Sequence, residues 1–397
     1  MSDQHLTGQT LRKGFTVGTH RLVPPAETLA RISPHLKAMQ ITRCADITGL
    51  DRIGIPVYCA VRPMGELLQL ANGKGATPLN ARVSALMEAI EHYHAEQPNG
   101  RLRRTTWETL SRSGQRVVSP ASLPGLKPHV YFSQQFKLDW VEGEDLVTGE
   151  PVWLPASVAY LCAPSLYDLS TNGLASGNHL VEATLHGLYE VIERDAISQL
   201  FVGGRLKLGP ERCLVMDLCT VNDDLVSGLL DKLERARVKP VLIWVRSALP
   251  VHTFWAVLLD GQAASPSTMV NVGYGTHTSP SVAAVRAITE AAQSRLSFIH
   301  GAREDMGYKI RSTSRALAAR IYTYFDRLGD SGQAVGNWQT LTNKASDDLH
   351  QDLRLIIHAL VAAGYSSVFR LDMTRAPFHI PVAKVLVPGL QMKSRLF

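Results

Sequence analysis

Residues 84–96 read SALMEAIEHYHAE, a helical pattern that places two acids and a hydroxyl on one side. At 100° per residue, Ser84, Glu88 and Glu91 fall within about 60° of one another on a helical wheel. Apolar residues of the same segment, such as Leu86 and Ile90, supply core contacts. The fold must therefore bury the apolar side of this helix and still leave its row of oxygen atoms accessible to a ligand.

A second long helix, predicted in NHLVEATLHGLYEVIERDA, repeats the pattern. Glu182, His186, Glu190 and Glu193 fall within about 80° of one another, and Asn178 lies one turn before Glu182. Like charges at this spacing repel by a few tenths of a kcal/mol per pair, and a hard cation such as Mg²⁺ would relieve the repulsion. Two solvent-exposed acidic faces are the alternative, although these stripes contain Ser and Asn where a solvated face has Lys and Arg.

Two glycine-containing segments are predicted as turns before helices. Gly273 and Gly275 precede a helix expected at 280–302, and a helix N-terminus after such a turn can bind an anion. The segment NGKG, which contains Lys74, predicts a weaker site of the same kind. It is not a Walker A loop, because GxxxxGK[ST] is absent. A turn without any ligand is the favoured explanation of the NGKG segment.

The later helix also carries polar residues on one face. Glu290 and Gln293 share a face, Arg286 lies one turn earlier, and Arg295 adds a cationic donor. These residues are candidates to contact a bound anion.

The remaining patterns predict an α+β fold with substantial antiparallel sheet. Strands are expected within 41–75, in KPVLIWVRS and in TFWAVLLDG, and a hairpin is expected with its turn at Thr148 and Gly149. A further helix is predicted near 345–363 and a strand near 366–371. The sequence shows no internal repeat of fixed period and no clean βαβ alternation.

Composition narrows the class of protein. The 397 residues carry a net charge of +6, which is mild for a nucleic-acid binder, and the short basic run Arg101, Arg103 and Arg104 is predicted to be solvated surface or a contact for an anionic partner. Five cysteines without a CxxC pair favour a reducing compartment. No signal peptide and no stretch of about 18 apolar residues is visible, so we expect a cytoplasmic protein without a membrane partner.

Several segments together resemble the YcaO family, most closely its TfuA-associated type. They are GKG…ARVSALMEAIEHYHAE, TNGLASGNHLVEATLHGLYEVIERDA and EAAQSRLSFIHGARED, supported by TRCADITGLDRIGIPVYCAVRP and PVAKVLVPGL. The resemblance implies a YcaO-type α+β fold, in which mixed and antiparallel sheets and packed helices form a non-standard ATP site. It implies an N-terminal arm at residues 1–40 that contributes to the nucleotide site, and a catalytic domain at residues 41–397.

The resemblance also implies cofactors, ATP and Mg²⁺, and site residues. The motifs match with three departures: His92 stands where many members have Arg, Ala175 stands where some have Ser, and Arg21 stands where Lys is more familiar. The implied catalytic residues are Arg194, Gln293 and Arg295; the nucleotide-binding residues are Arg21, Thr28, Lys74, Ser84, Asn178, Glu190 and Arg194; and the magnesium ligands are Glu88, Glu91, Glu182, Glu193 and Glu290.

The implied activity is ATP-dependent phosphorylation of a backbone amide oxygen in a precursor peptide. Many azoline-forming members end in Pro-x-Pro-x-Pro, whereas this chain ends VPGLQMKSRLF, which favours thioamide formation with a TfuA-like partner. Azoline formation on Cys, Ser or Thr remains an alternative, as does a non-catalytic ATP-binding accessory protein in a methylthiolation system. A partner protein that presents the peptide or the sulfur is expected, as is a homodimer; a nucleic-acid partner is not.

Overall fold

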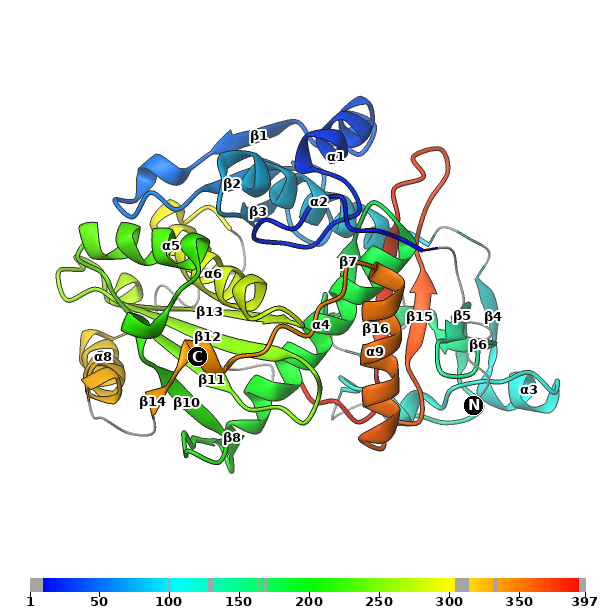
Figure 1. The fold of residues 1–397 in the computed structure, drawn as a ribbon. Helices are drawn as coiled ribbons and strands as arrows, with labels where there is room; N and C mark the ends of the chain where they lie inside the picture. Colours follow the sequence, from blue (N-terminus) through cyan, green and yellow to red (C-terminus); the bar gives the residue numbers. More distant parts are fainter. Residues whose placement is uncertain are drawn as a thin grey trace.

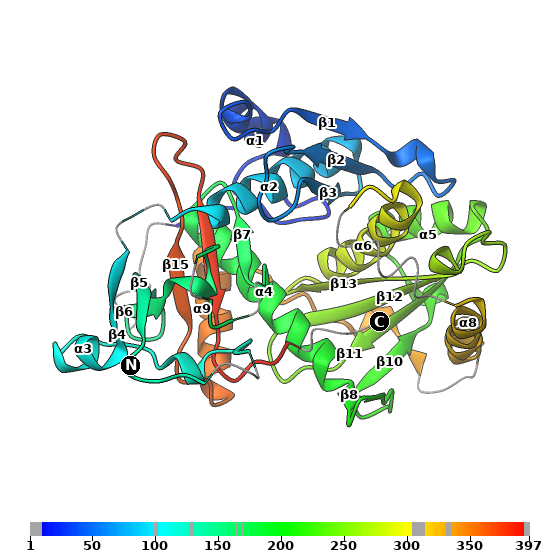
Figure 2. The ribbon, with the colours of Figure 1, turned by 180° about the vertical axis from the view of Figure 1, so that it is seen from behind.

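The chain has an α+β architecture in which helices pack on antiparallel sheets, with one short parallel pair of strands. A long central helix runs between the two larger sheets (Figures 1 and 2). Within the described residues, no helix combines the length and the apolar character needed to cross a membrane. The computed structural model describes residues 10–98, 100, 102–127, 131–162, 165–167, 170–303, 314–330 and 335–392.

The N-terminal part forms a three-stranded sheet and two helices. These elements are α1 (Pro25–Ile32), β1 (Arg43–Asp46), β2 (Val57–Val61), β3 (Leu70–Lys74) and α2 (Pro78–Glu96). The strand order is β1–β2–β3, and α2 packs on β2 and β3. The hydroxyl of Thr77 accepts a hydrogen bond from the Asn80 N–H and caps α2. Leu86 and Ile90 are buried, which confirms their predicted core positions.

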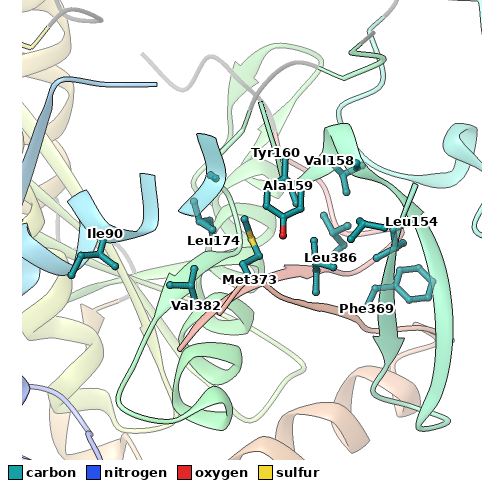
Figure 3. Close-up of a cluster of buried hydrophobic side chains, with 14 of the residues drawn as sticks. Ile90, Leu154, Val158, Ala159, Tyr160, Leu174, Phe369, Met373, Val382 and Leu386 are labelled. Carbon is teal, nitrogen blue, oxygen red and sulfur yellow. The ribbon is translucent and has the colours of Figure 1, made fainter. Parts of the chain in front are cut away.

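A six-stranded antiparallel sheet forms the second part of the fold. Its elements and the helices beside it are β4 (Arg103–Thr106), α3 (Trp107–Arg112), β5 (Lys137–Asp145), β6 (Glu150–Pro155), β7 (Leu174–Ser176), α4 (Leu180–Gln199), α9 (Leu349–Ala362), β15 (Phe369–Asp372) and β16 (Val382–Leu386). The strand order is β4–β5–β15–β16–β7, with β6 paired to β5. One face buries an apolar cluster that includes Leu174, Met373 and Val382 (Figure 3). Helices α4 and α9 cover the other face.

A five-stranded sheet forms the third part of the fold, on the other side of the central helix α4 (Figures 1 and 2). It and its neighbours comprise β8 (Phe201–Val202), β9 (Arg205–Leu206), β10 (Cys213–Met216), α5 (Asp224–Arg235), β11 (Lys239–Val245), β12 (His252–Leu259), β13 (Val270–His277), α6 (Pro280–His300), α8 (Arg315–Asp330) and β14 (Val335–Gly336). The order is β13–β12–β11–β10–β14. On β12, Phe254 and Leu258 face α5 and α6, whereas Trp255 and Val257 lie on the side of α8. Burial of both faces explains the unbroken apolar run of this strand.

The predicted periodic elements are confirmed. The helices expected near 178–200, 280–302 and 345–363 are α4, α6 and α9. The predicted hairpin is β5–β6, and its turn contains Thr148 and Gly149. Arg101 of the predicted basic run lies outside the described residues, as do the two chain ends before residue 10 and after residue 392.

Both predicted glycine turns are wrong, because these segments are strand. Gly73 lies in β3, and Gly273 and Gly275 lie in β13. A Cβ at Gly73 would collide with the backbone of α2 at Ala85, and one at Gly273 would collide with α6 at Ala291. None of these three glycines has a positive φ. Glycine is therefore required here for the close approach of a helix to a strand, and not for a turn.

Three strand–helix units surround the centre of the molecule: β3 with α2, β7 with α4, and β13 with α6. Each helix also contacts the strand of another unit, so that α2 touches β7, α4 touches β13 and α6 touches β3. Glu88, Glu190 and Glu290 occupy matching positions, 102 and 100 residues apart. The chain thus contains three similar strand–helix units, although their lengths and spacing differ and the sequence has no repeat of fixed period.

Candidate active site

Five acids converge from the three long helices. They act on one another electrostatically: Glu190 and Glu290 act on Glu88, and Glu88 and Glu190 act on Glu91. Burial raises the pKa of Glu88 to about 7 and that of Glu91 to about 8. Burial, followed by the charge of Glu290, raises the pKa of Glu193 to about 7. These carboxylates form one cluster, the acid cluster: Glu88, Glu91, Glu190, Glu193 and Glu290.

The oxygens of the acid cluster are only partly engaged by protein donors. Glu91 Oε1 accepts hydrogen bonds from the backbone N–H of Ser176, at 2.7 Å, and from its hydroxyl, at 2.6 Å. Oε2 of Glu193 is buried and has no hydrogen-bond partner within the described part of the chain. A buried carboxylate oxygen without a donor favours either a proton or a cation beside it.

Basic side chains surround the acid cluster. Lys74 Nζ lies 2.8 Å from Oε2 of Glu290, and Arg194 lies 3.8 Å from Oε1 of Glu190. Burial acts to raise the pKa of Glu290, but the cations Lys74 and Arg194 outweigh it and lower that pKa. The guanidinium of Arg194 also lies over the ring of Tyr274, with 5.9 Å to the centroid. The site therefore combines acids, which can bind a metal ion, with basic side chains, which can contact the phosphates bound to that metal.

Arg286 and His186 belong to this site. The sequence placed Arg286 among the candidates to contact an anion and His186 on the acidic face of its helix, but neither was expected to hold the nucleotide or the metal. Arg286 Nη1 donates to Nε2 of His186 at 3.1 Å. Burial, followed by the charges of Arg21 and Arg286, lowers the pKa of His186 well below its usual value, so its ring is neutral and can accept this bond. A signal existed: each lies four residues before an acid of the cluster, as Ser84 lies four before Glu88.

The N-terminal arm holds the start of α4. Its Leu22 N–H donates to Glu182 Oε2 at 2.7 Å, and Arg21 lies 3.5 Å from Glu182 Oε1. The Thr28 hydroxyl donates to the side-chain oxygen of Asn178 at 2.9 Å, and Asn178 donates twice to Glu182. The structure thus brings these four predicted residues together beside the acid cluster. Both oxygens of Glu182 accept hydrogen bonds from protein donors. The same is true of Glu290, whose Oε1 accepts from the Tyr274 N–H at 3.2 Å and whose Oε2 accepts from Lys74.

Three other predicted residues have different surroundings. Ser84 is half-buried on α2, one turn before Glu88. The Gln293 amide donates to the backbone oxygen of Asn72 on β3 and is buried. Arg295 does not join the acid cluster: it forms ion pairs with Asp51 and Asp260, at 2.9 and 3.0 Å. The periodicity placed Arg295 on α6 but could not show that its guanidinium would reach Asp51 and Asp260.

The donors present fit magnesium by their chemistry. Carboxylate oxygens are the ligands that Mg²⁺ prefers, and Oε2 of Glu193 is buried without a donor among the described residues. Among the described residues, however, no three His, Cys, Asp or Glu side chains are already gathered around one point. A bound ion would therefore have to draw the carboxylates together.

A family model and a solved structure place this α+β fold in a class of proteins that bind ATP and Mg²⁺. The chain belongs to the YcaO family, because the model of that family, described as YcaO cyclodehydratase, ATP- and Mg²⁺-binding, matches residues 72–391. The predicted family and its cofactors, ATP and Mg²⁺, are thereby confirmed at the level of the family.

Two relatives without an assigned function align with nearly the whole chain. A protein of Methanothermobacter thermautotrophicus is 37% identical, covering 94% of this chain and 95% of the relative. A protein of Rhizobium leguminosarum bv. trifolii, named for its place in the tfuA 3' region, is 32% identical, covering 98% of this chain and 93% of the relative.

Two solved structures confirm the YcaO-type fold. YcaO from Methanopyrus kandleri, bound with AMPPCP and Mg²⁺, superposes with a TM-score of 0.73 at 26% identity, covering 96% of this chain and 94% of that one. A heterocyclase in complex with substrate and cofactor gives a TM-score of 0.79 at 21% identity. That match covers 97% of this chain and 54% of the heterocyclase, and it supports the fold alone.

Proposed function

We propose that this chain uses ATP and Mg²⁺ to phosphorylate a backbone amide oxygen of a peptide, and that the product is a thioamide formed with a TfuA-like partner. The observation that carries the proposal is the acid cluster: five carboxylates from three helices, flanked by Lys74, Arg194 and Arg286. This arrangement suits a magnesium-bound triphosphate, which needs both anionic ligands for the metal and cationic donors for the phosphates.

The chemistry depends on making the amide oxygen a leaving group. ATP supplies the phosphoryl group that converts this oxygen into part of phosphate, and sulfide replaces it on the carbon. Glu88, Glu91 and Glu193 would hold the metal, while Arg194 and Arg286 would neutralise charge on the phosphates. The protein needs no nucleophile of its own, since its task is to position reactants and compensate charge.

The N-terminal arm has a defined part in this proposal. Arg21 and Thr28 would contact the nucleotide, and their present partners, Glu182 and Asn178, would fix them in place. We therefore retain the division into an arm at residues 1–40 and a catalytic domain at residues 41–397. Gln293 and Arg295 are retained only as supports of α6, because their polar groups are engaged in contacts within the fold.

Substitution of one acid tests the site. Glu88→Gln removes a carboxylate without changing the size of the side chain, so we expect an intact fold, loss of magnesium-dependent AMPPCP binding by calorimetry and loss of ATP hydrolysis. Glu234→Gln, at an exposed acid of α5, is the matched control and should behave as the unchanged protein. Full binding and turnover by the Glu88 variant would refute the proposal.

Product mass separates the alternatives. Replacing an amide oxygen by sulfur adds about 16 Da, whereas azoline formation removes water, about 18 Da; the phosphorylation step is common to both. Peptides from cells with and without the gene should differ by the first value. Loss of 18 Da would instead support a cyclodehydratase acting on Cys, Ser or Thr. Magnesium-dependent nucleotide binding without either change would favour an accessory protein in a methylthiolation system.

The relative encoded beside tfuA supports the choice of partner. We expect co-purification with a TfuA-like protein and a homodimer of this chain, both of which size-exclusion chromatography with light scattering measures. A monomer that modifies its peptide without any second protein would contradict both expectations.

A further inference from the structure

A buried lysine, Lys384, has no part in the reaction proposed above. It lies in the middle of β16, and only 3% of it is exposed. Its partners on the adjacent strands are Leu371 and Leu174, both members of the apolar cluster of the six-stranded sheet. An ammonium among aliphatic side chains is costly unless polar partners compensate it, so this position calls for an explanation.

The polar partners of Lys384 lie on the segment before β7. Its Nζ donates to the backbone oxygen of Ser170 at 2.6 Å. The next residue of β16, Val385, donates its N–H to the backbone oxygen of Gly173 at 2.8 Å. Two successive residues of β16 thus hold the two ends of segment 170–173.

Segment 170–173 in turn contacts an acid of the active site. The Gly173 N–H donates to Oε2 of Glu190 at 3.3 Å. Gly173 has a φ of 77°, and a Cβ there would collide with the backbone oxygen of Val385. Because the segment is held at both ends, its conformation directs this N–H at the carboxylate. Glu190 is also the acid whose charge acts on Lys384.

We propose that Lys384 is a positioning residue: its ammonium holds segment 170–173 and thereby orients Glu190 for the nucleotide site. This inference rests on the proposed function, since Glu190 needs a fixed orientation only if the acid cluster serves Mg²⁺ and a nucleotide. Groups that orient ligands in this indirect way change metal affinity by about 10–100-fold when they are removed.

Hydrogen exchange without any ligand gives the primary test. Lys384→Met keeps the length of the side chain and suits its apolar surroundings, so we expect a folded protein. The amide of Gly173 should exchange about tenfold faster in this variant, because the segment opens more easily. Lys384→Arg should retain protection, and Leu386→Met, two residues along the same face of β16, is the matched control. Unchanged exchange in Lys384→Met overturns the proposal.

Binding of Mg²⁺ and AMPPCP, measured by calorimetry, gives the second test. We expect an affinity loss of about tenfold in Lys384→Met and near-normal affinity in Lys384→Arg. A lower melting temperature in Lys384→Met with unaltered affinity would mean a purely structural lysine and would overturn the inference. If the unchanged protein binds no AMPPCP, the proposed function fails, while the exchange experiment still decides whether Lys384 holds the segment.

Discussion

Arg295 shows what a single buried cation does for this fold. Its guanidinium connects α6 to two acids. Asp51 lies between β1 and β2, and Asp260 directly follows β12. The side chains of Arg295 and Asp51 are 4% exposed, and that of Asp260 is fully buried. A buried ion pair contributes little more to the free energy of unfolding than two apolar side chains in its place would. Removing one partner, however, leaves a buried charge uncompensated and destabilises the fold.

Arg295→Met should therefore destabilise the protein and leave the chemistry of the site alone. We expect a loss of about 3 kcal/mol in the free energy of unfolding, because Asp51 loses its buried partner. Urea titration measures this loss. Arg320→Met, on the exposed surface of α8, is the matched control and should change stability little. If the variant unfolds at an unaltered urea concentration but no longer binds AMPPCP, Arg295 acts in the active site and this account of it is wrong.

Residue-level prediction succeeded where helical spacing alone decides which way a side chain points. The spacing of Glu88 and Glu91 on one helix, and of Glu190 and Glu193 on another, was enough to expect a shared cluster. It could not place Arg295, because a long side chain reaches partners that lie far away in the sequence. The pairing of Arg286 with His186 depends on two helices meeting, which no local pattern encodes.

At the scale of elements, close packing of helix on strand governs the site. Helices α2 and α6 lie so near β3 and β13 that glycine is needed at Gly73 and at Gly273. The periodicity of these helices is a local property and was predicted correctly. The strands were mistaken for turns, because glycine signals both a turn and a close backbone approach, and only the tertiary structure distinguishes them.

Gly273→Ala should force α6 away from β13 and thereby disturb the acid cluster. We expect a loss of about 1–3 kcal/mol in the free energy of unfolding, as for other overpacked sites, and weaker binding of Mg²⁺ and AMPPCP. Gly228→Ala, in the exposed middle of α5 with nothing near its added methyl group, should instead stabilise by up to about 1 kcal/mol. Equal stability of the two variants, measured by urea titration, would contradict this packing argument.

For the whole molecule, the acid cluster links stability to pH. Glu88, Glu91 and Glu193 hold their protons more tightly in the folded chain, with pKa values of about 7, 8 and 7, than in the unfolded chain, where a glutamate has a pKa near 4.5. The folded state therefore binds more protons between these values. Stability is highest below this window and falls as pH rises through the folded pKa values.

The melting temperature of the metal-free protein should consequently fall between pH 7 and 8.5, a range above the ordinary pKa of histidine, about 6.5. Mg²⁺ with AMPPCP should reduce this fall, because the ion compensates the carboxylates. Glu91→Gln should also have a shallower dependence on pH, since it lacks one titrating group. Differential scanning calorimetry measures all three, and a melting temperature that rises with pH in the unchanged protein would contradict the account.

The order of the three strand–helix units along the chain has a consequence for synthesis. The last of the three helices ends only at His300, about three quarters of the way along the chain, and β16, which clasps the segment beside Glu190, comes later still. On the ribosome, the acids of α2 and α4 therefore lack the contacts that α6 and β16 supply until those two elements have been made. The nucleotide site can therefore form only after β16 has been made. A chain truncated before β16 should bind no nucleotide, instead of binding it weakly.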